Sequence, residues 1–343
     1  AALDQPGDLW FKTYRRREMP RRLTEINPVV GELAFGEAEQ FTFEGWNDET
    51  VHAWVIKPAN YVEGEKYPVA FLIHGGPQGT FSDEATQKIR TGGVSITYTG
   101  TFVEALFKVT EDPESVAVVP VENSVAGTVA QVQDSLVSND LLILGEINLL
   151  IEYALLANAE LEKVEFCFAH PQALEQSSGY ISGNLAKAQS KLTRSNVDSG
   201  IQFLEAVDSG SVSAAAIVPV SFAEDYPQWK YAFGIQDYQN NTTRFLVVRS
   251  RKTNEKLDYS CKKTSLFVEF QDDRSGLLYQ LLSVFNLFQI NLCRLESRPA
   301  KDTPWAYVFY VDFYNSTDTE ACLDVLSFSN FRYKVLGSYD SLG

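Results

Sequence analysis

The feature that constrains the fold most is a regular exchange of apolar, strand-like runs and helix-like runs between residues 77 and 250. The runs typical of buried strands are Val116–Val121, Leu141–Ile147, Val164–Phe168, Ala214–Val218 and Phe245–Val248. Helix patterns lie between them, for example over Thr128–Leu136 and Val197–Val207. This alternation predicts an open α/β sheet that binds its ligands at the carboxyl ends of the strands.

A different order follows over residues 263–343. The patterns run strand, helix, strand, strand, helix, strand, over Ser265–Phe270, Leu277–Phe288, Asn291–Glu296, Trp305–Phe313, Asp318–Phe328 and Arg332–Gly337. This βαββαβ order predicts a ferredoxin-like domain, which is commonly a ligand-sensing or pairing module. The charged stretch Arg249–Cys261 is predicted to be the linker.

The residues before about Gly76 form a separate segment. A basic cluster between Arg15 and Arg22 favours a solvated connecting stretch over a nucleic-acid contact. Alternating residues predict strands at Gln40–Phe43 and Val51–Ile56, and Pro68–His74 has the continuous apolar character of a buried strand. We therefore expect domains at 1–67, 68–250 and 263–343.

Composition narrows the class of protein. The chain has 343 residues, of which 45% are hydrophobic and 22% charged, as expected of a soluble globular protein. A net charge of −16 argues against nucleic-acid and anionic-membrane partners, and no apolar run reaches the roughly 18 residues of a membrane span. The four cysteines form no Cys-x-x-Cys pair and the three histidines are not spaced as ligands, which predicts reduced cysteines, a cytoplasmic location and no metal site.

Thr243 and Arg244 stand where a polar loop enters the strand predicted at Phe245–Val248. A hydroxyl beside a guanidinium suits a small anionic substrate with an oxygen leaving group. Asn-Thr-Thr is also a good turn sequence, so this pattern alone leaves a plain loop open.

Other polar residues follow predicted strands in the same way. Thr80 and Ser82 precede a helix pattern, where free N–H groups favour a carboxylate, although either residue can simply be the N-cap. Glu122, Asn123 and Ser124 lie just past the strand Val116–Val121, at the edge where an α/β sheet binds ligands. His170 and Gln176 follow the strand Val164–Phe168, and we expect His170 to fix the turn there rather than to titrate in catalysis.

Residues 76–339 carry several motifs that resemble, in family order, prephenate dehydratase with a C-terminal ACT regulatory domain. The dehydratase motifs are Gly76–Ser82, Val119–Ser124, His170–Gln176 and Thr243–Phe245. The segments Gly276–Leu278 and Glu296–Pro299 resemble the phenylalanine-sensing motifs of the ACT domain. The resemblance implies a two-lobed α/β core like that of periplasmic binding proteins, followed by a βαββαβ domain.

The resemblance also implies roles for single residues. The residues expected to be catalytic are Thr243, Glu122, Asn123 and Gln176. Those expected to bind substrate are Thr80, Ser82, Ser124, His170, Ser199, Arg244 and Phe245. The expected phenylalanine site comprises Gly276, Leu277, Leu278, Asn291, Glu296, Ser297, Arg298 and Pro299. Thr243 is expected to donate to the departing hydroxyl and Glu122 to orient neighbouring donors, while Arg244 either neutralises a substrate carboxylate or braces the loop.

The implied reaction is the decarboxylating dehydration of prephenate to phenylpyruvate in L-phenylalanine biosynthesis, without a metal or organic cofactor. Feedback inhibition by L-phenylalanine and a homodimer or homotetramer are expected as well. Ala169 departs from the family, which usually carries Ser there, and Asp198-Ser199-Gly200 replaces a Ser-Thr-Ala segment. These departures keep two alternatives open: a catalytically impaired amino-acid-binding or interaction protein, and an arogenate dehydratase.

The segment Ala34–Gly79 resembles something else, the junction between propeller and hydrolase domain in the prolyl oligopeptidase family. The run Pro68–Pro77 matches that family's first hydrolase strand and His-Gly-Gly-Pro loop. The chain lacks a Gly-x-Ser-x-Gly nucleophile elbow, so peptidase activity is rejected. The overlap of the two resemblances at Gly76–Gly79 predicts a fusion.

Overall fold

The computed structural model describes residues 10–11, 21–22, 38–44, 50–56, 71–75, 80–90, 94–210, 212–270, 274–300, 306–329 and 331–342, with the backbone alone up to residue 75. The chain divides into two compact units, Ala1–Pro68 and Val69–Gly343. In the first unit, β1 (Trp10–Phe11) pairs with β2 (Arg21–Arg22), and β3 (Ala38–Glu44) pairs with β4 (Thr50–Ile56). The strands predicted at Gln40–Phe43 and Val51–Ile56 are thus confirmed, whereas Arg15, Arg16 and Arg17 lie outside the described residues.

The second unit begins with a lobe built on a central sheet. Its strands, in spatial order, are β9 (Leu141–Leu150), β15 (Thr242–Ser250), β7 (Val116–Asn123), β5 (Phe71–Gly75) and β6 (Ser95–Thr99), with β8 (Gly127–Thr128) beside β7. The helices of this lobe are α1 (Phe81–Ile89), α2 (Phe102–Glu111) and α3 (Ala130–Ser138). β5 lies between β6 and β7 and runs parallel to both, so the Pro68–His74 run does supply a strand to this sheet.

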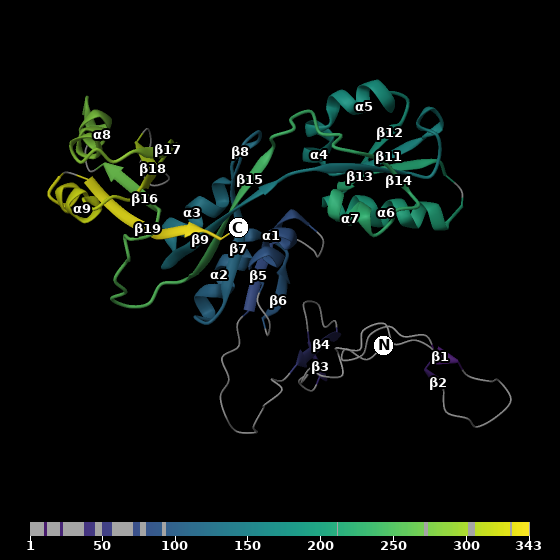
Figure 1. Cartoon of the computed structure of the whole chain (residues 1–343), viewed down its shortest axis with the longest axis horizontal. Helices are drawn as coiled ribbons and strands as arrows, with labels where there is room; N and C mark the ends of the chain where they lie inside the picture. Colours follow the sequence, from purple (N-terminus) through teal and green to yellow (C-terminus); the bar gives the residue numbers. More distant parts are fainter. Residues whose placement is uncertain are drawn as a thin grey trace. The chain divides into compact units, whose positions relative to one another are not determined.

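The chain crosses from β9 into a second lobe and returns through β15. This lobe holds a five-stranded sheet of order β12 (Gln189–Leu192), β11 (Phe166–Ala169), β13 (Ala214–Pro219), β10 (Tyr153–Ala157) and β14 (Lys230–Phe233). Its helices are α4 (Pro171–Gln176), α5 (Ser178–Asn184), α6 (Asn196–Asp208) and α7 (Val220–Glu224), with a 3₁₀ turn at Leu161–Lys163. Figure 1 shows the two lobes joined by long strands, as the two-lobed prediction requires.

The chain ends in the predicted βαββαβ domain. Its elements are β16 (Lys263–Phe270), α8 (Leu277–Leu287), β17 (Leu292–Pro299), β18 (Tyr307–Tyr314), α9 (Thr319–Ser327) and β19 (Phe331–Ser341). The strand order β17-β18-β16-β19 confirms the ferredoxin-like topology. β19 continues beyond the predicted Gly337 and pairs in parallel with β9 at Asp340 and Ser341, so this domain shares one sheet with the first lobe (Figure 1).

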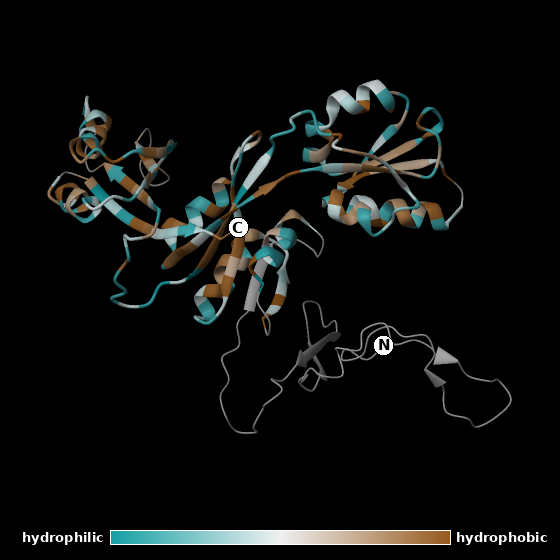
Figure 2. Cartoon of the chain, in the orientation of Figure 1, coloured by the Kyte–Doolittle hydropathy of each residue, from teal (hydrophilic) through white to brown (hydrophobic). Residues whose placement is uncertain are grey.

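Gly337 allows this junction to be close. A Cβ atom at residue 337 would lie 2.4 Å from the carbonyl oxygen of Ile143, in β9, so a side chain there would force the two strands apart. The hydrophobic residues concentrate on the strands, while the helices carry hydrophilic residues on one side (Figure 2). None of the described helices combines the length and the hydropathy that a membrane span requires.

Candidate active site

The site begins with a hydroxyl and an amide on neighbouring strands. Thr243 of β15 stands opposite Asn123 of β7, next to an irregularity in the pairing. Asn123 Oδ1 accepts the backbone N–H groups of Val125 and Ala126 at 3.0 and 2.7 Å, which fixes its Nδ2 as the end that faces Thr243. Nδ2 donates to Thr243 Oγ1 at 2.8 Å. The Thr243 oxygen is thus an acceptor in this bond, which leaves its hydrogen for a ligand.

A chain of amides continues from Asn123 into the second lobe. Asn123 Nδ2 also donates to Asn241 Oδ1 at 2.7 Å, and Asn241 Nδ2 donates to Gln176 Oε1 at 3.0 Å. Each amide is thereby oriented by the one before it, beginning from the backbone N–H groups that bind Asn123. Gln176 belongs to α4 and Asn241 to the segment that returns between the lobes, so these contacts tie the two lobes together.

The far end of this chain holds two amide donors that are buried without a partner. Gln176 Oε1 also accepts from Tyr153 Oη at 3.3 Å, and Gln236 Oε1 accepts from Tyr153 N at 3.0 Å. Burial raises the pKa of Tyr153, so its phenol stays a donor. Within the described part of the chain, neither Gln176 Nε2 nor Gln236 Nε2 has a hydrogen-bond partner. A buried unpaired donor costs about 1–3 kcal/mol, which favours a ligand oxygen as the partner of each.

The start of α1 lies beside the same tyrosine. Thr80 is the N-cap residue of α1 and Ser82 is buried in its first turn. Between them, Phe81 packs edge-on against the Tyr153 ring, with 5.5 Å between ring centroids. The start of α1 therefore lies near the amide chain, and the N–H groups at a helix start favour an anionic group.

Two of the predicted site residues point away from this cluster. Successive residues of a strand face opposite sides of a sheet, so Glu122 and Arg244 lie across the sheet from Asn123 and Thr243. Glu122 Oε2 lies 3.0 Å from Arg294 Nε, and Arg244 Nε donates to Glu146 Oε2 at 2.7 Å. Neither contact points toward Thr243, so these contacts do not favour the expected roles of Glu122 in orienting catalytic donors and of Arg244 in binding a substrate carboxylate, and both roles stay predictions. Of the two alternatives for Arg244, the contacts favour bracing.

The remaining predicted substrate residues shape the site through local bonds. Ser124 Oγ accepts from Thr242 N at 2.9 Å and so holds the loop before Thr243. Ser199 Oγ lies 2.7 Å from Thr193 Oγ1 and is fully buried in α6. Phe245 packs in the hydrophobic core. As substrate contacts these residues stay predictions.

His170 caps α4, as the turn interpretation of the sequence predicts. Its Nδ1 accepts from Gln172 N at 3.3 Å, and burial lowers its pKa. The unfolded chain therefore binds a proton more readily, so the stability that this cap contributes is full above the ordinary histidine pKa of about 6.5 and is lost as pH falls toward the lower folded value.

We expect the unfolding free energy of the unmodified chain to decline from pH 8 to pH 5.5 relative to a His170→Asn variant, because asparagine caps without titrating. Denaturant unfolding of both proteins at the two pH values measures this. A constant difference would mean that His170 does not titrate on unfolding.

The predicted phenylalanine-site residues divide between two places. Gly276 begins α8 with φ +84°, a conformation that favours glycine, and Leu277 packs in the core of the βαββαβ domain. Leu278 packs against that core, and Asn291 is exposed at the start of β17. In β17 the side chains alternate, with Ser297 and Pro299 exposed.

Glu296 and Arg298, on the other side of β17, contact the first lobe. Glu296 Oε2 accepts from Thr128 Oγ1 at 2.8 Å, and Arg298 Nη1 donates to Asp134 Oδ1 at 2.9 Å. Two residues expected at the effector site therefore also join the βαββαβ domain to the lobe that carries Thr243.

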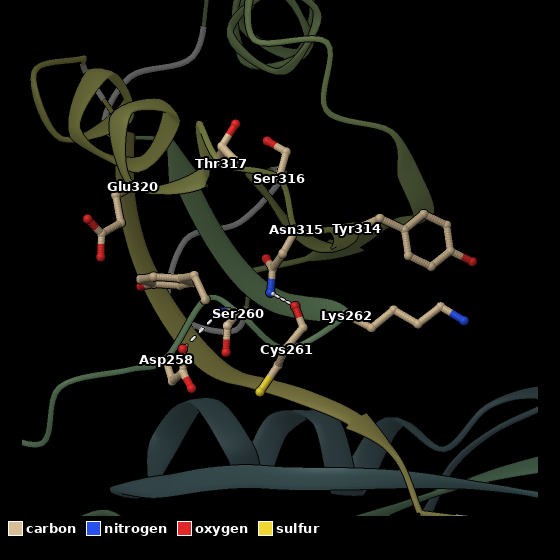
Figure 3. A pocket seen from close by; sticks show the side chains of 10 residues that line it. Asp258, Ser260, Cys261, Lys262, Tyr314, Asn315, Ser316, Thr317 and Glu320 are labelled. Atoms are coloured by element: carbon tan, nitrogen blue, oxygen red, sulfur yellow. Dashed lines mark hydrogen bonds between the residues drawn. The ribbon is translucent and has the colours of Figure 1, made fainter.

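A separate groove of about 670 Å³ lies in the βαββαβ domain, between residues 258–262 and 314–320. Figure 3 shows the polar side chains that line it, with Asn315 Nδ2 donating to the carbonyl oxygen of Cys261 at 2.7 Å. Its lining contains none of the residues predicted for either site. The amide cluster between the lobes is thus the stronger candidate for chemistry.

The geometry defines a class of protein: a two-lobed α/β core whose lobes meet at a buried cluster of neutral amides and the hydroxyls of Thr243 and Tyr153, with a βαββαβ domain in the same sheet. Residues 69–253 match the family model for prephenate dehydratase. The chain belongs to the prephenate dehydratase family.

Individual relatives agree with this assignment. The prephenate dehydratase of Methanocaldococcus jannaschii is 33% identical over 274 residues, which span 78% of this chain and 97% of that protein. The crystal structure of the Staphylococcus aureus prephenate dehydratase is similar with a TM-score of 0.67 and 28% identity, over 78% of this chain and 99% of that one. A prephenate dehydratase from Arthrobacter aurescens in complex with L-Phe has a TM-score of 0.67 and 27% identity, over 79% of this chain and 90% of that one.

Sequence reasoning missed three residues of the cluster. Asn241 was noticed only as part of a turn, and Tyr153 and Gln236 carried no local signal. Tyr153 lies in β10, which was not predicted, and Gln236 lies in an irregular segment. Only the fold brings them to Gln176.

Proposed function

We propose that this chain is a prephenate dehydratase in which Thr243 is the hydrogen-bond donor to the departing hydroxyl. The observation that carries the proposal is the fixed orientation of Asn123, which makes the Thr243 oxygen an acceptor and leaves its hydrogen for the substrate. A donor held at the place where charge develops stabilises the transition state more than the ground state.

The conversion of prephenate to phenylpyruvate consumes one proton. The bond between the ring and its carboxylate breaks, its electron pair enters the ring, and the carbon–oxygen bond at the opposite ring carbon breaks. The products are phenylpyruvate, carbon dioxide and water. The hydrogen bond from Thr243 strengthens as the leaving oxygen gains charge, and the proton from solvent completes the water.

The cluster also suggests how prephenate lies. Its hydroxyl and the carbon that bears both acid groups are at opposite ends of the ring. We place the hydroxyl of prephenate at Thr243. The unpaired amide groups of Gln176 and Gln236 lie at the other end of the chain of hydrogen bonds, where they can donate to the keto-acid group of prephenate. Amide N–H groups donate to a keto oxygen or a carboxylate but offer nothing to an ammonium group, which favours prephenate over arogenate.

Exchanging Gln236 for glutamate tests this placement. The carboxylate still accepts from Tyr153 N but replaces the N–H₂ group with a charged oxygen, so we expect kcat/KM for prephenate to fall by about 10- to 100-fold, mainly through KM, and discrimination against arogenate to weaken. Steady-state kinetics with both substrates measures this. The matched control is Gln239→Glu, an exposed residue with the same change of charge. Equal kinetics for the two variants would remove Gln236 from the substrate site.

Two alternatives remain as separate outcomes. Faster turnover of arogenate than of prephenate would make the chain an arogenate dehydratase. Ala169 motivates the catalytically impaired alternative, because this buried residue lacks the side-chain hydroxyl that the family usually carries there; its carbonyl oxygen accepts from Thr193 N at 3.1 Å. Binding of prephenate or phenylalanine without turnover by either substrate would support that alternative.

We also propose L-phenylalanine as the effector bound by the βαββαβ domain, a homodimer or homotetramer, and a cytoplasmic location. The Arthrobacter relative in complex with L-Phe supports the effector. The family match begins at residue 69, and β5 belongs to the central sheet. The peptidase-like origin of residues 34–79 stays a prediction. The division into domains at 1–67, 68–250 and 263–343 also stays a prediction. A chain lacking residues 1–60 is expected to retain dehydratase activity.

A further inference from the structure

A buried ion cluster lies directly behind Thr243. The guanidinium of Arg244 uses all three of its nitrogens: Nε donates to Glu146 Oε2 at 2.7 Å, Nη1 to Asp312 Oδ2 at 2.5 Å and Nη2 to Tyr339 Oη at 2.7 Å. All three acceptor residues are buried, with exposed fractions of 6% for Glu146, 3% for Asp312 and 1% for Tyr339. Each nitrogen of the Arg244 guanidinium is therefore bound to a buried group of the protein.

Lys263 and Ser265 form further hydrogen bonds to the residues that accept from Arg244. Lys263 Nζ donates to Glu146 Oε1 at 2.6 Å, and Ser265 Oγ donates to Asp312 Oδ1 at 2.5 Å and also contacts Tyr339 Oη. Burial alone would raise the pKa of Asp312, but the nearby Arg244 and Arg294 hold it below its usual value. The carboxylate therefore stays charged, and each charge in the network depends on the others.

The network crosses the boundary between two domains. Arg244 and Glu146 belong to β15 and β9 of the first lobe, whereas Lys263, Asp312 and Tyr339 belong to β16, β18 and β19 of the βαββαβ domain. β19 also pairs with β9 beside Glu146. Movement of these strands relative to β15 would leave buried charges unpaired, so the network resists separate movement of the first lobe and the βαββαβ domain.

We propose that Arg244 is a positioning residue that ties the strand carrying Thr243 to the regulatory domain. Thr243 and Arg244 are consecutive in β15 and face opposite sides of the sheet, so a displacement of the guanidinium turns the backbone that presents the Thr243 hydroxyl. A shift of β16, β18 or β19 would then move Arg244 and, through β15, the Thr243 hydroxyl. Coupling between two sites requires such an element, which both sites can displace. This role presupposes the proposed dehydratase function.

Tyr339→Phe tests the proposal with little change in packing. It removes the hydroxyl that accepts from Arg244 but keeps the ring. The matched control is Tyr333→Phe in the same strand, whose hydroxyl donates to the Leu323 carbonyl oxygen at 3.0 Å within the regulatory domain. We expect Tyr339→Phe to lower kcat with KM for prephenate unchanged, and to shift the L-phenylalanine concentration for half inhibition by about fivefold or more. Tyr333→Phe is expected to change neither value, even if both variants lose thermal stability.

The outcomes separate this proposal from the proposed function. No turnover of prephenate or arogenate by the folded, unmodified chain overturns the dehydratase function, and the positioning role falls with it. Turnover by the unmodified chain, combined with the same kcat and the same phenylalanine response in both tyrosine variants, overturns the positioning role alone. If the unmodified chain converts prephenate but is not inhibited by phenylalanine, the kinetic constants of Tyr339→Phe decide. A lower kcat with an unchanged KM would then support the positioning role, and an unchanged kcat would overturn it.

Discussion

Replacing Thr243 with alanine is expected to lower kcat for prephenate by about two to three orders of magnitude, because it removes the one hydroxyl that the cluster presents to the leaving group. Asn123 donates to the Thr243 oxygen at 2.8 Å, so the alanine variant also leaves this amide with one acceptor fewer. KM should change less than kcat, since the lost bond is strongest in the transition state. Steady-state measurement of phenylpyruvate formation tests this.

Two further variants sharpen the assignment of Thr243. Thr243→Ser keeps the hydroxyl and should retain most of the activity. Thr242→Ala is the matched control, because the Thr242 hydroxyl donates to the Asn240 carbonyl oxygen at 3.3 Å, on the exposed side of the loop. Comparable kcat values for Thr243→Ala and Thr242→Ala would contradict the catalytic role of Thr243.

Replacing Asp312 with alanine is expected to lower the free energy of unfolding by about 3–5 kcal/mol, the usual cost of leaving a buried charge without its partner. Asp312 accepts from Arg244 and Ser265 and is almost completely buried, so its loss removes one of the two carboxylates that hydrogen-bond to the Arg244 guanidinium. Denaturant unfolding at neutral pH measures the change.

The control for Asp312 lies at the end of β19. Asp340 is exposed and accepts from Lys262 N at 2.7 Å, so Asp340→Ala should cost much less than Asp312→Ala. Double replacement of Arg244 and Asp312 should cost less than the sum of the single replacements, because the second change removes the charge that the first leaves unpaired. Additive losses would show that the two side chains do not act together.

The fold was largely predictable because its strands and helices carry strong local periodicity. The run Val116–Val121 became β7 and the run Ala214–Val218 became β13, each nearly as predicted. The βαββαβ order was read correctly from alternation and length alone. β10 was missed because its apolar residues follow those of β9 closely, with no turn signal between them, and the end of β19 was missed because its polar residues pair with a distant strand.

Only the site residues that belong to a family motif could be predicted from the sequence. Thr243, Asn123 and Gln176 come together as the family resemblance implied. Arg244 and Glu122 could not be placed, because adjacent residues face opposite sides of a strand and the partners of these two, Asp312 and Arg294, come from a different domain. Long-range partners of this kind follow from strand register and domain contact, which local sequence patterns do not contain.

The most direct test of the dehydratase assignment is to incubate the full, folded chain with prephenate and to quantify phenylpyruvate and carbon dioxide together. We expect the two products to form in equal amounts, at a rate that Thr243→Ala lowers about a hundredfold or more. A folded chain that releases neither product would rule out the dehydratase function, and an equal rate with and without the Thr243 hydroxyl would rule out the catalytic role of Thr243.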